Sequence, residues 1–230
     1  GGVEALLNAV PASAQETEEA DDTEARIEGR GGRRPVLGFE SVPVSSDDDV
    51  VVPKGYTAEV LIAWGDPVSS GPSFKQDASN TAADQARQWG MHNDGLVYFP
   101  VVGSQRGLIV QNNEYTDDGL LFPDGVNNWT QEKTNKSLNA HGVSIIEVTK
   151  RTGFPWDWKR RRGKWDVVRP SPFARRITGM TPIEIGGPAA GDPRLMTSDD
   201  PTGRRALGTL NNCAMGFTPW GTYLACEENF

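Results

Sequence analysis

Short apolar runs separated by glycine- and proline-rich turns constrain the fold of this chain more than any other feature. The 230 residues include 26 glycines, 16 prolines and seven tryptophans, and helical periodicity is scarce. Only residues 80–89 and 131–138 have the pattern of short helices. Frequent tight turns between short strands are typical of all-β proteins. We therefore expect an all-β fold.

The apolar runs have the lengths of strands and fall into hairpins. The expected strands are residues 57–64, 96–102, 107–112, 143–149, 165–169, 206–213 and 222–227. The four strands between residues 96 and 169 follow one another as two hairpins, so we expect one antiparallel sheet of four strands. The last two strands should pair across the turn at residues 218–221.

Repeated four-stranded antiparallel units are the building block of a β-propeller, in which the innermost strands line a central channel. The chain offers about one and a half such blades, whereas a propeller needs at least about four blades to close. A partial β-propeller is therefore the expected architecture. A single β-sandwich of about seven strands is the alternative that the strand spacing leaves open.

Residues 1–36 are not expected to belong to the fold. Residues 1–14 are small and apolar and end in Ala-Ser-Ala, the form that signal peptidases cleave, which predicts a signal-peptide remnant. A short amphipathic helix over residues 3–10 is the alternative. Residues 15–36 are largely acidic and lack an apolar period, which predicts a disordered linker before a folded domain at residues 37–230.

The net charge of the chain and the length of its apolar runs argue against two partners, nucleic acid and the membrane interior. A net charge of −8 argues against a nucleic-acid-binding surface. The single basic run, residues 159–162, is expected at an exposed loop tip. No run approaches the roughly 20 apolar residues of a membrane span, so we expect no membrane-spanning segment.

The densest set of candidate metal ligands lies at the end of the chain. These ligands are Cys213, Glu227, Glu228, Asn211, Asn212 and Asn229. A thiolate suits iron or zinc, while carboxylate and amide oxygens suit calcium or magnesium, so this segment is equipped for more than one class of metal. Because the sequence stops directly after this motif, we interpret the chain as a fragment.

The two cysteines leave several roles open. In an exported protein Cys213 and Cys226 could form a disulfide. We expect Cys226 to point with Leu224 into the protein interior, opposite to Glu227, which argues against that pairing. The roles that remain for Cys213 are metal ligand, disulfide partner and buried free thiol.

A second group of candidates lies at the ends of the first hairpin. Glu114 stands between asparagines and a tyrosine, an oxygen-rich setting that suits a hard cation. Asp94 precedes a glycine and either caps a turn or joins that cluster. His92 and His141 are candidate ligands or acid–base groups, with a structural role favoured for His141. The motifs of serine hydrolases, nucleotide-binding loops and helix-loop-helix calcium sites are absent from the sequence.

Five runs of the sequence carry a family resemblance, namely GYTAEVLIAWGDPV, QWGMHNDGLVYFP, LIVQNNEYTD, NAHGVSIIEV and TLNNCAMGFTPWGTYLACEEN. Over residues 37–230 they resemble the N-terminal third of PhoX-type alkaline phosphatases. The resemblance implies a six-bladed β-propeller with iron and calcium in its channel mouth. It also implies export by the twin-arginine route, and thus a periplasmic or secreted protein. We expect the full-length protein to be a monomer.

The same resemblance implies site residues and a reaction. Cys213 corresponds to an iron ligand, and Glu227 and Glu228 to metal-site residues. The further candidates are Glu114, Asp94, Asn212 and Asn229. Fe(3+) and Ca(2+) are the implied cofactors for the hydrolysis of small phosphate monoesters.

An essential arginine and the remaining ligands are expected beyond residue 230, so the chain alone is expected to be inactive. Two alternatives to the phosphatase stay open. The first is a calcium-stabilised propeller that binds a ligand without hydrolysis, and the second is a calcium-dependent lactonase-like hydrolase.

Overall fold

The structure is a computed structural model that describes residues 39–151 and 164–228. It divides into two compact units, Gly1–Ala58 and Glu59–Phe230. The described part of the first unit forms no helix or strand, and in it the rings of Phe39 and Tyr56 meet edge to face, 5.6 Å between centroids. The expected signal remnant and linker, and the basic run at 159–162, lie outside the described residues.

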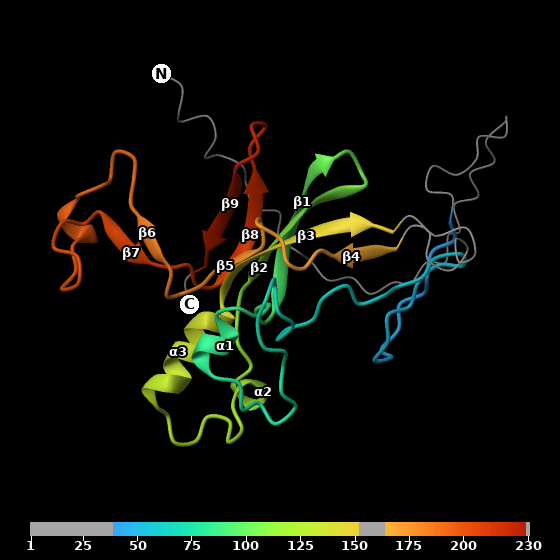
Figure 1. The fold of residues 1–230 in the computed structure, drawn as a ribbon, viewed down its shortest axis with the longest axis horizontal. Coiled ribbons are helices and arrows are strands. Elements are labelled where there is room, and N and C mark those ends of the chain that lie inside the picture. The colour runs from blue at the N-terminus through green and yellow to red at the C-terminus, as the bar shows by residue number, and fades with distance from the viewer. Residues whose placement is uncertain (1–38, 152–163, 229–230) are drawn as a thin grey trace, which may run out of the picture. The chain divides into compact units, whose positions relative to one another are not determined.

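The second unit is built on a five-stranded antiparallel sheet (Figure 1). Its strands are β1 (Asn93–Val102), β2 (Arg106–Asn113), β3 (Gly142–Lys150), β4 (Trp165–Val167) and β5 (Arg175–Ile177). The expected order β1-β2-β3-β4 is confirmed. The short β5 is an addition: β4 pairs with the end of β3 and β5 with its beginning, so both share one edge of that long strand.

Two further hairpin-like pairs complete the β-structure. They are β6 (Pro182–Glu184) with β7 (Arg205–Leu207), and β8 (Asn212–Phe217) with β9 (Tyr223–Glu227). The strand expected over residues 206–213 is wrong, because the chain turns between β7 and β8. There the Gly208 amide donates to the Thr181 carbonyl at 3.0 Å, and Asn211 adopts a left-handed φ of 48°.

The turn expected at residues 218–221 is confirmed. The Thr218 amide donates to the carbonyl of Thr222 at 2.9 Å, which closes the β8–β9 hairpin.

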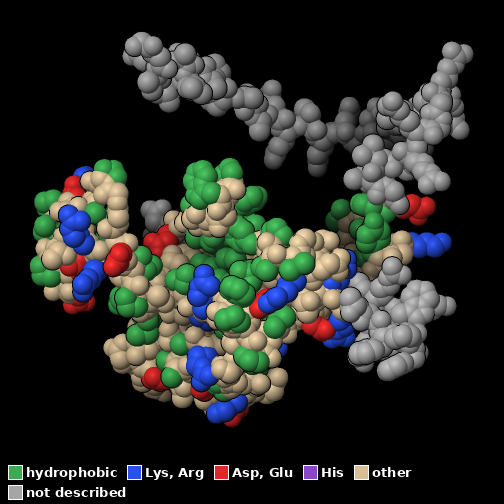
Figure 2. Space-filling view, turned by 45° about the horizontal axis from the view of Figure 1, so that its top comes forward, with side chains coloured by type: hydrophobic (Ala, Val, Ile, Leu, Met, Phe, Trp, Pro, Cys, Tyr) green, Lys and Arg blue, Asp and Glu red, His purple; other side chains and the backbone are tan. Residues whose placement is uncertain are grey.

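Hydrophobic side chains gather on the face of the molecule drawn in Figure 2. The β8–β9 hairpin adds to the exposed ones, since Phe217 and Trp220 are 61% and 79% exposed.

The helices are short, as the sequence predicts. They are α1 (Ala82–Gln85), α2 (Asp118–Leu121), α3 (Gln131–Ala140) and the 3-10 turn η2 (Pro193–Leu195). Thr81 and Asp84 cap α1 reciprocally, and the Thr130 side chain caps α3. Among the helices that the structure describes, none has the length and apolar character needed to cross a membrane.

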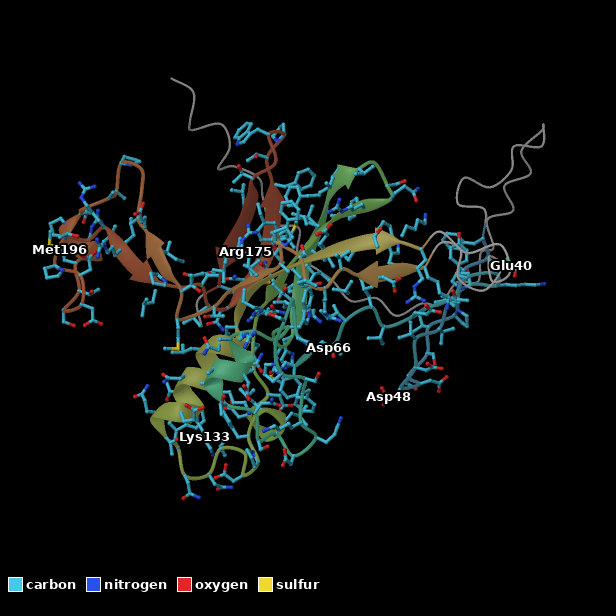
Figure 3. The ribbon with its side chains drawn as sticks, viewed as in Figure 1. Glu40, Asp48, Asp66, Lys133, Arg175 and Met196 are labelled. Carbon is cyan, nitrogen blue, oxygen red and sulfur yellow. The ribbon has the colours of Figure 1, made fainter. Side chains whose placement is uncertain are left out.

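The strand expected over residues 57–64 is wrong. Asp66 (Figure 3) folds the end of this run into a turn, because its carboxylate accepts from the Ala63 amide at 2.9 Å. The apolar Leu61 and Ile62 pack instead against buried side chains that include Trp89 and Ile146. The run therefore contributes apolar contacts to the core without joining a ladder.

The described residues form a mostly β protein with three buried apolar clusters. The clusters centre on Trp89 and Ile146, on Leu121 and Phe122, and on Val97 and Ile145. The first and third cover side chains of β3, whose residues 142–148 are buried throughout. The sheet does not close into a barrel over the described residues. The beginnings of β1 and β8 lie beside the end of β2.

Candidate metal centre

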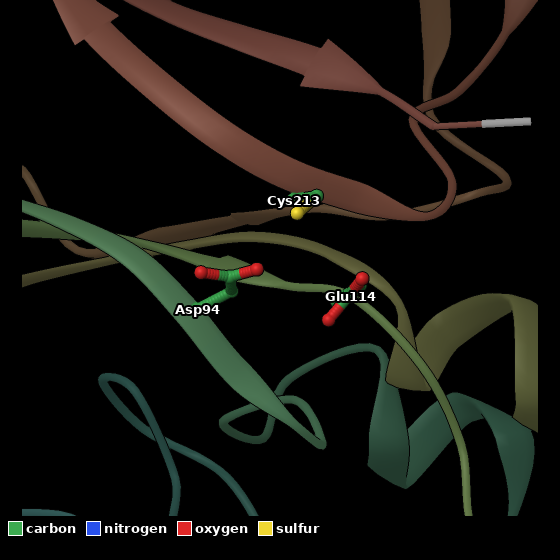
Figure 4. A group of neighbouring side chains, drawn as sticks. All are labelled: Asp94, Glu114 and Cys213. Carbon is green, nitrogen blue, oxygen red and sulfur yellow. The ribbon is translucent and has the colours of Figure 1, made fainter. Parts of the chain in front are cut away.

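Three side chains that can bind a cation meet where β1 begins, β2 ends and β8 begins (Figure 4). Asp94 lies in β1, Glu114 directly follows β2, and Cys213 lies in β8. One carboxylate oxygen of each acid and the Cys213 Sγ all lie within 4.8 Å of one another. Asp94 is exposed, and the other two are half-buried. A single ion could contact all three.

Irregularities in two separate strand pairs bring these ligands together. From Asn93 to Leu96 β1 advances three residues while β2 advances two, from Asn113 to Gln111, so Asp94 and Gly95 form a bulge. The same irregularity occurs in β8 between Asn212 and Met215. Bulges turn side chains out of the regular alternation and are frequent beside functional sites. Asp94 and Cys213 each stand in such a bulge.

Buried amides frame the site on the β2 side. The Asn112 Nδ2 donates to the carbonyl oxygens of Cys213 and Ala214, at 2.9 and 3.2 Å. The Tyr223 hydroxyl donates to the Asn112 Oδ1 at 2.8 Å. The Asn211 Nδ2 donates to the Glu114 carbonyl at 3.4 Å. These contacts link the strand that carries the thiol to the strand that carries Glu114.

A second set of amides fixes the ends of β1 and β2. Asn93 and Asn113 are partners in the ladder, and the Asn113 Nδ2 donates to the Asn93 Oδ1 at 2.9 Å. The Trp89 indole donates to the same oxygen at 2.8 Å. Arg176, on β5, donates to the Asn113 Oδ1 and to the carbonyl oxygen of Asn139. Asp94 and Glu114 directly follow this anchored pair.

The electrostatics of the site favour a bound cation. A hydrogen bond to Asp94, desolvation and the negative charges of Asp94, Glu114 and Glu228 raise the pKa of the Cys213 thiol to about 12. Burial and the Asp94 charge raise the pKa of Tyr223 to about 12 as well. In the ranges 39–151 and 164–228, no ion pair involves Asp94 or Glu114. The negative charge is therefore left for a ligand to balance.

The donor set fits the metals that the sequence predicts. A thiolate is a soft ligand that suits iron or zinc, and two carboxylates add the oxygen ligands that hard cations such as calcium prefer. A cation at the centre of the three groups would reverse the effect of the acids and favour the thiolate. Asp94 lies within reach of the same ion as Glu114 and Cys213.

The other predicted ligands have different surroundings. The Glu227 Oε1 accepts from the Thr209 hydroxyl and the Leu210 amide, at 2.7 and 2.9 Å, and so holds the turn before β8. Glu228 is exposed, and its charge acts on Cys213. The Asn212 Oδ1 accepts from Thr209 at 2.5 Å, and Asn229 lies outside the described residues. The metal roles of these residues stay predictions.

Neither histidine belongs to the described cluster. His141 is buried, and its Nδ1 lies 2.8 Å from the Ser137 carbonyl oxygen. Burial lowers the pKa of His141, in keeping with a neutral side chain that is part of the interior. His92 is exposed and stacks edge to face on Tyr115, 5.9 Å between centroids.

The disulfide alternative is wrong, because both cysteines are free. Cys226 is exposed, and Leu224 on the same strand is 49% exposed, so the expectation that both point into the interior is also wrong. In the described part of the chain β9 pairs with β8 alone, and all its residues after Tyr223 are exposed. Cys213 remains available as a ligand.

Two residues of the frame escaped the sequence analysis. Asn112 was part of an oxygen-rich run, but nothing in the run indicates that its amide bonds to β8. Tyr223 lies in an alternating strand, where a tyrosine is ordinary. The one signal in the sequence is a run of two asparagines at a strand end beside an acid.

Comparisons with known proteins identify the family of this chain. The family model described as alkaline phosphatase PhoX matches residues 37–230. A solved structure, "Pseudomonas fluorescens PhoX in complex with vanadate, a transition state analogue", is 44% identical with a TM-score of 0.76. The match covers 84% of this chain and 32% of that chain, so this chain spans about a third of the relative's length. A search of curated proteins found no match. The chain belongs to the alkaline phosphatase PhoX family.

Proposed function

We propose that this chain supplies part of the metal centre of a phosphatase that hydrolyses phosphate monoesters. The observation that carries the proposal is the cluster of Asp94, Glu114 and Cys213, with ligand atoms within 4.8 Å, in a member of the PhoX family. The related structure holds vanadate, described as a transition state analogue. A site for phosphoryl transfer needs positive charge, and these residues are suited to holding it.

The residues would act by binding and orienting. Cys213 would hold Fe(3+), because sulfur is the soft donor of the set. Asp94 and Glu114 would supply carboxylate oxygens to Ca(2+), and the exposed Glu228 would add negative charge beside them. The chemistry supplied by bound iron and calcium is neutralisation of the phosphoryl oxygens and activation of an oxygen nucleophile. The bulges of β1 and β8 contain Asp94 and Cys213, two of the three donors.

The remainder of the proposal concerns the whole protein. We infer a β-propeller in which further strands complete the site and supply a phosphate-binding arginine, acting on small phosphate monoesters in the periplasm or outside the cell. The 32% coverage of the related chain supports further site residues outside these 230. The antiparallel sheet β1-β2-β3-β4 supports a propeller, because it has the strand order of one blade.

The full-length gene product provides the test. Turnover of a chromogenic phosphate monoester should be lost on chelation and restored by iron with calcium, while a lactone substrate should not be hydrolysed. Cys213→Ala should abolish both turnover and bound iron, and Cys226→Ala, at the exposed cysteine, is the matched control. Turnover that is indifferent to chelators, or a Cys213→Ala variant that keeps its iron, would overturn the proposal.

A further inference from the structure

The thiol and the two carboxylates of the candidate metal centre belong to different sheets. Asp94 lies in the five-stranded sheet and Glu114 directly follows one of its strands, whereas Cys213 comes from β8, which in the described part of the chain pairs with β9 alone. Within the described ranges, no backbone-to-backbone hydrogen bond joins β8 to β1 or β2. The distance between the thiol and the carboxylates therefore depends on side chains that cross between the sheets.

The Asn112 side chain connects the two sheets through both its nitrogen and its oxygen. Its Nδ2 donates to the carbonyls of Cys213 and Ala214, at 2.9 and 3.2 Å, and its Oδ1 accepts from the Tyr223 hydroxyl at 2.8 Å. The residue is 0% exposed. One side chain from β2 thus binds the bulge of β8 and the first residue of β9.

The backbone around Asn112 leaves little freedom at this junction. Asn112 lies opposite the β1 bulge formed by Asp94 and Gly95, since its neighbours Asn113 and Gln111 pair with Asn93 and Leu96. The Tyr223 hydroxyl also lies 3.3 Å from the Gly95 carbonyl oxygen, to which it can donate. The Asn112 side chain thus contacts the bulge that contains Cys213, and the residue lies opposite the bulge that contains Asp94.

We propose that Asn112 is a positioning residue for the metal centre, whose amide holds the Cys213 backbone where the thiol meets Asp94 and Glu114. The inference rests on the proposed metal-dependent function and adds a residue that contacts no metal itself. Without the amide, two buried carbonyl oxygens lose their donors, and β8 is no longer fixed against β2. Partners that orient metal ligands typically change metal affinity by about 10- to 100-fold when removed.

The test is a titration of the metal-free, full-length protein with Co(2+) alone, a probe that accepts both thiolate and carboxylate ligands. The readout is the thiolate-to-cobalt charge-transfer band in the near ultraviolet, which reports the bond to sulfur independently of turnover. We expect Asn112→Ala and Asn112→Asp to weaken binding by about 10- to 100-fold and to reduce the band at saturation. The aspartate keeps the shape of the side chain but has no hydrogen to donate.

Asn139→Ala is the matched control. The Asn139 amide is also buried, donates to a backbone carbonyl, that of Ala82 at 3.0 Å, and accepts from a hydroxyl, that of Thr178 at 2.9 Å. It lies in α3, and its side chain bonds to Ala82 and Thr178 and not to the bulges of β1 and β8. A purely structural role for Asn112 predicts similar losses of stability in both variants and an unchanged cobalt band in both. The positioning role predicts that only the Asn112 variants lose the band.

Tyr223→Phe provides a second variant if Asn112→Ala does not fold. It removes only the hydroxyl that orients the Asn112 amide, and we expect a smaller loss of cobalt affinity in the same direction. If the parent shows no band that depends on Cys213, the metal centre itself fails and the positioning role with it. If the parent shows that band and folded Asn112→Ala or Tyr223→Phe keeps the parent's affinity and spectrum, the positioning role alone is overturned.

Discussion

Gly95 and Met215 are in such close contact that a β-carbon on Gly95 would lie 2.4 Å from the Met215 Cγ. The same atom would lie 3.1 Å from the Cys213 carbonyl oxygen. A side chain at this position would therefore have to displace β8, because the obstructing atoms include the Met215 Cβ at 2.8 Å and backbone. The approach of β1 to β8, and with it the approach of Asp94 to Cys213, depends on a residue without a β-carbon.

Gly95→Ala should consequently lower the free energy of unfolding by about 1–3 kcal/mol, the usual cost of overpacking an interior. Urea unfolding of the metal-free protein measures this change. Gly186→Ala is the control, because nothing lies within 4 Å of a β-carbon there and its φ is not positive. Equal stability of Gly95→Ala and Gly186→Ala would show that β8 is not held as closely as the structure indicates.

Arg176→Lys should destabilise the sheet behind the site. The Arg176 guanidinium donates to Asn113, Ser144 and the carbonyls of Asn139 and His141, and burial lowers its pKa to about 9. A lysine cannot reproduce the planar fork that serves these acceptors. Leaving one or more of them unpaired costs about 1–3 kcal/mol. Thermal unfolding should separate this variant from the neighbouring, exposed Arg175→Lys, and identical melting temperatures for the two would contradict the prediction.

Asp200 should make stability depend on pH in the acid range. A hydrogen bond from the Thr202 hydroxyl, with amide donors from residues 202, 204 and 205, lowers the pKa of Asp200 to about 2. Because the folded-state pKa lies below the unfolded value, its stabilisation is present above about pH 4 and is lost as the pH falls towards 2. Asp200→Asn should therefore be less stable than the parent at pH 7, with the difference shrinking as the pH approaches 2.

The adjacent, exposed Asp199→Asn is the control for that pH series. Its melting temperature should follow that of the parent across the range, since substitutions at exposed positions seldom change stability much. If the melting temperatures of the parent and Asp200→Asn differed by the same amount from pH 7 to pH 2, the ionised carboxylate would not be what holds the loop at residues 197–205.

The paired strands were predictable because their signals are local. Two apolar runs and the turn expected at residues 103–106 indicate β1 and β2, and the long buried run of β3 accepts partners along its length. Residues 57–64 are also apolar but pair with no strand in the described structure, and the side chains of Leu61 and Ile62 pack in the core beside Trp89. Composition indicates that a run will be buried, and pairing depends on what lies beside it.

The metal centre was predictable in its residue types but not in its membership. Cys213 and Glu114 stood out as donors at strand ends, and the structure brings them together with Asp94. Which acid faces the thiol is decided by bulges in β1 and β8, and one extra residue in a strand leaves no periodic signal. Glu227 illustrates the limit, since its carboxylate accepts from the Thr209 hydroxyl in the turn before β8.

Calcium should stabilise the protein by relieving repulsion within the metal centre. Asp94, Glu114 and the Cys213 thiol lie within 4.8 Å of one another, and the acids raise the pKa of that thiol to about 12. A ligand that binds only the folded state stabilises it by about 2.7 kcal/mol at a concentration 100 times its dissociation constant. The melting temperature at pH 8 should therefore rise with calcium concentration. Glu114→Gln should reduce that rise, whereas Glu184→Gln, at an exposed acid of β6, should preserve it. A calcium response that is the same in Glu114→Gln and in the parent would place the stabilising ion elsewhere.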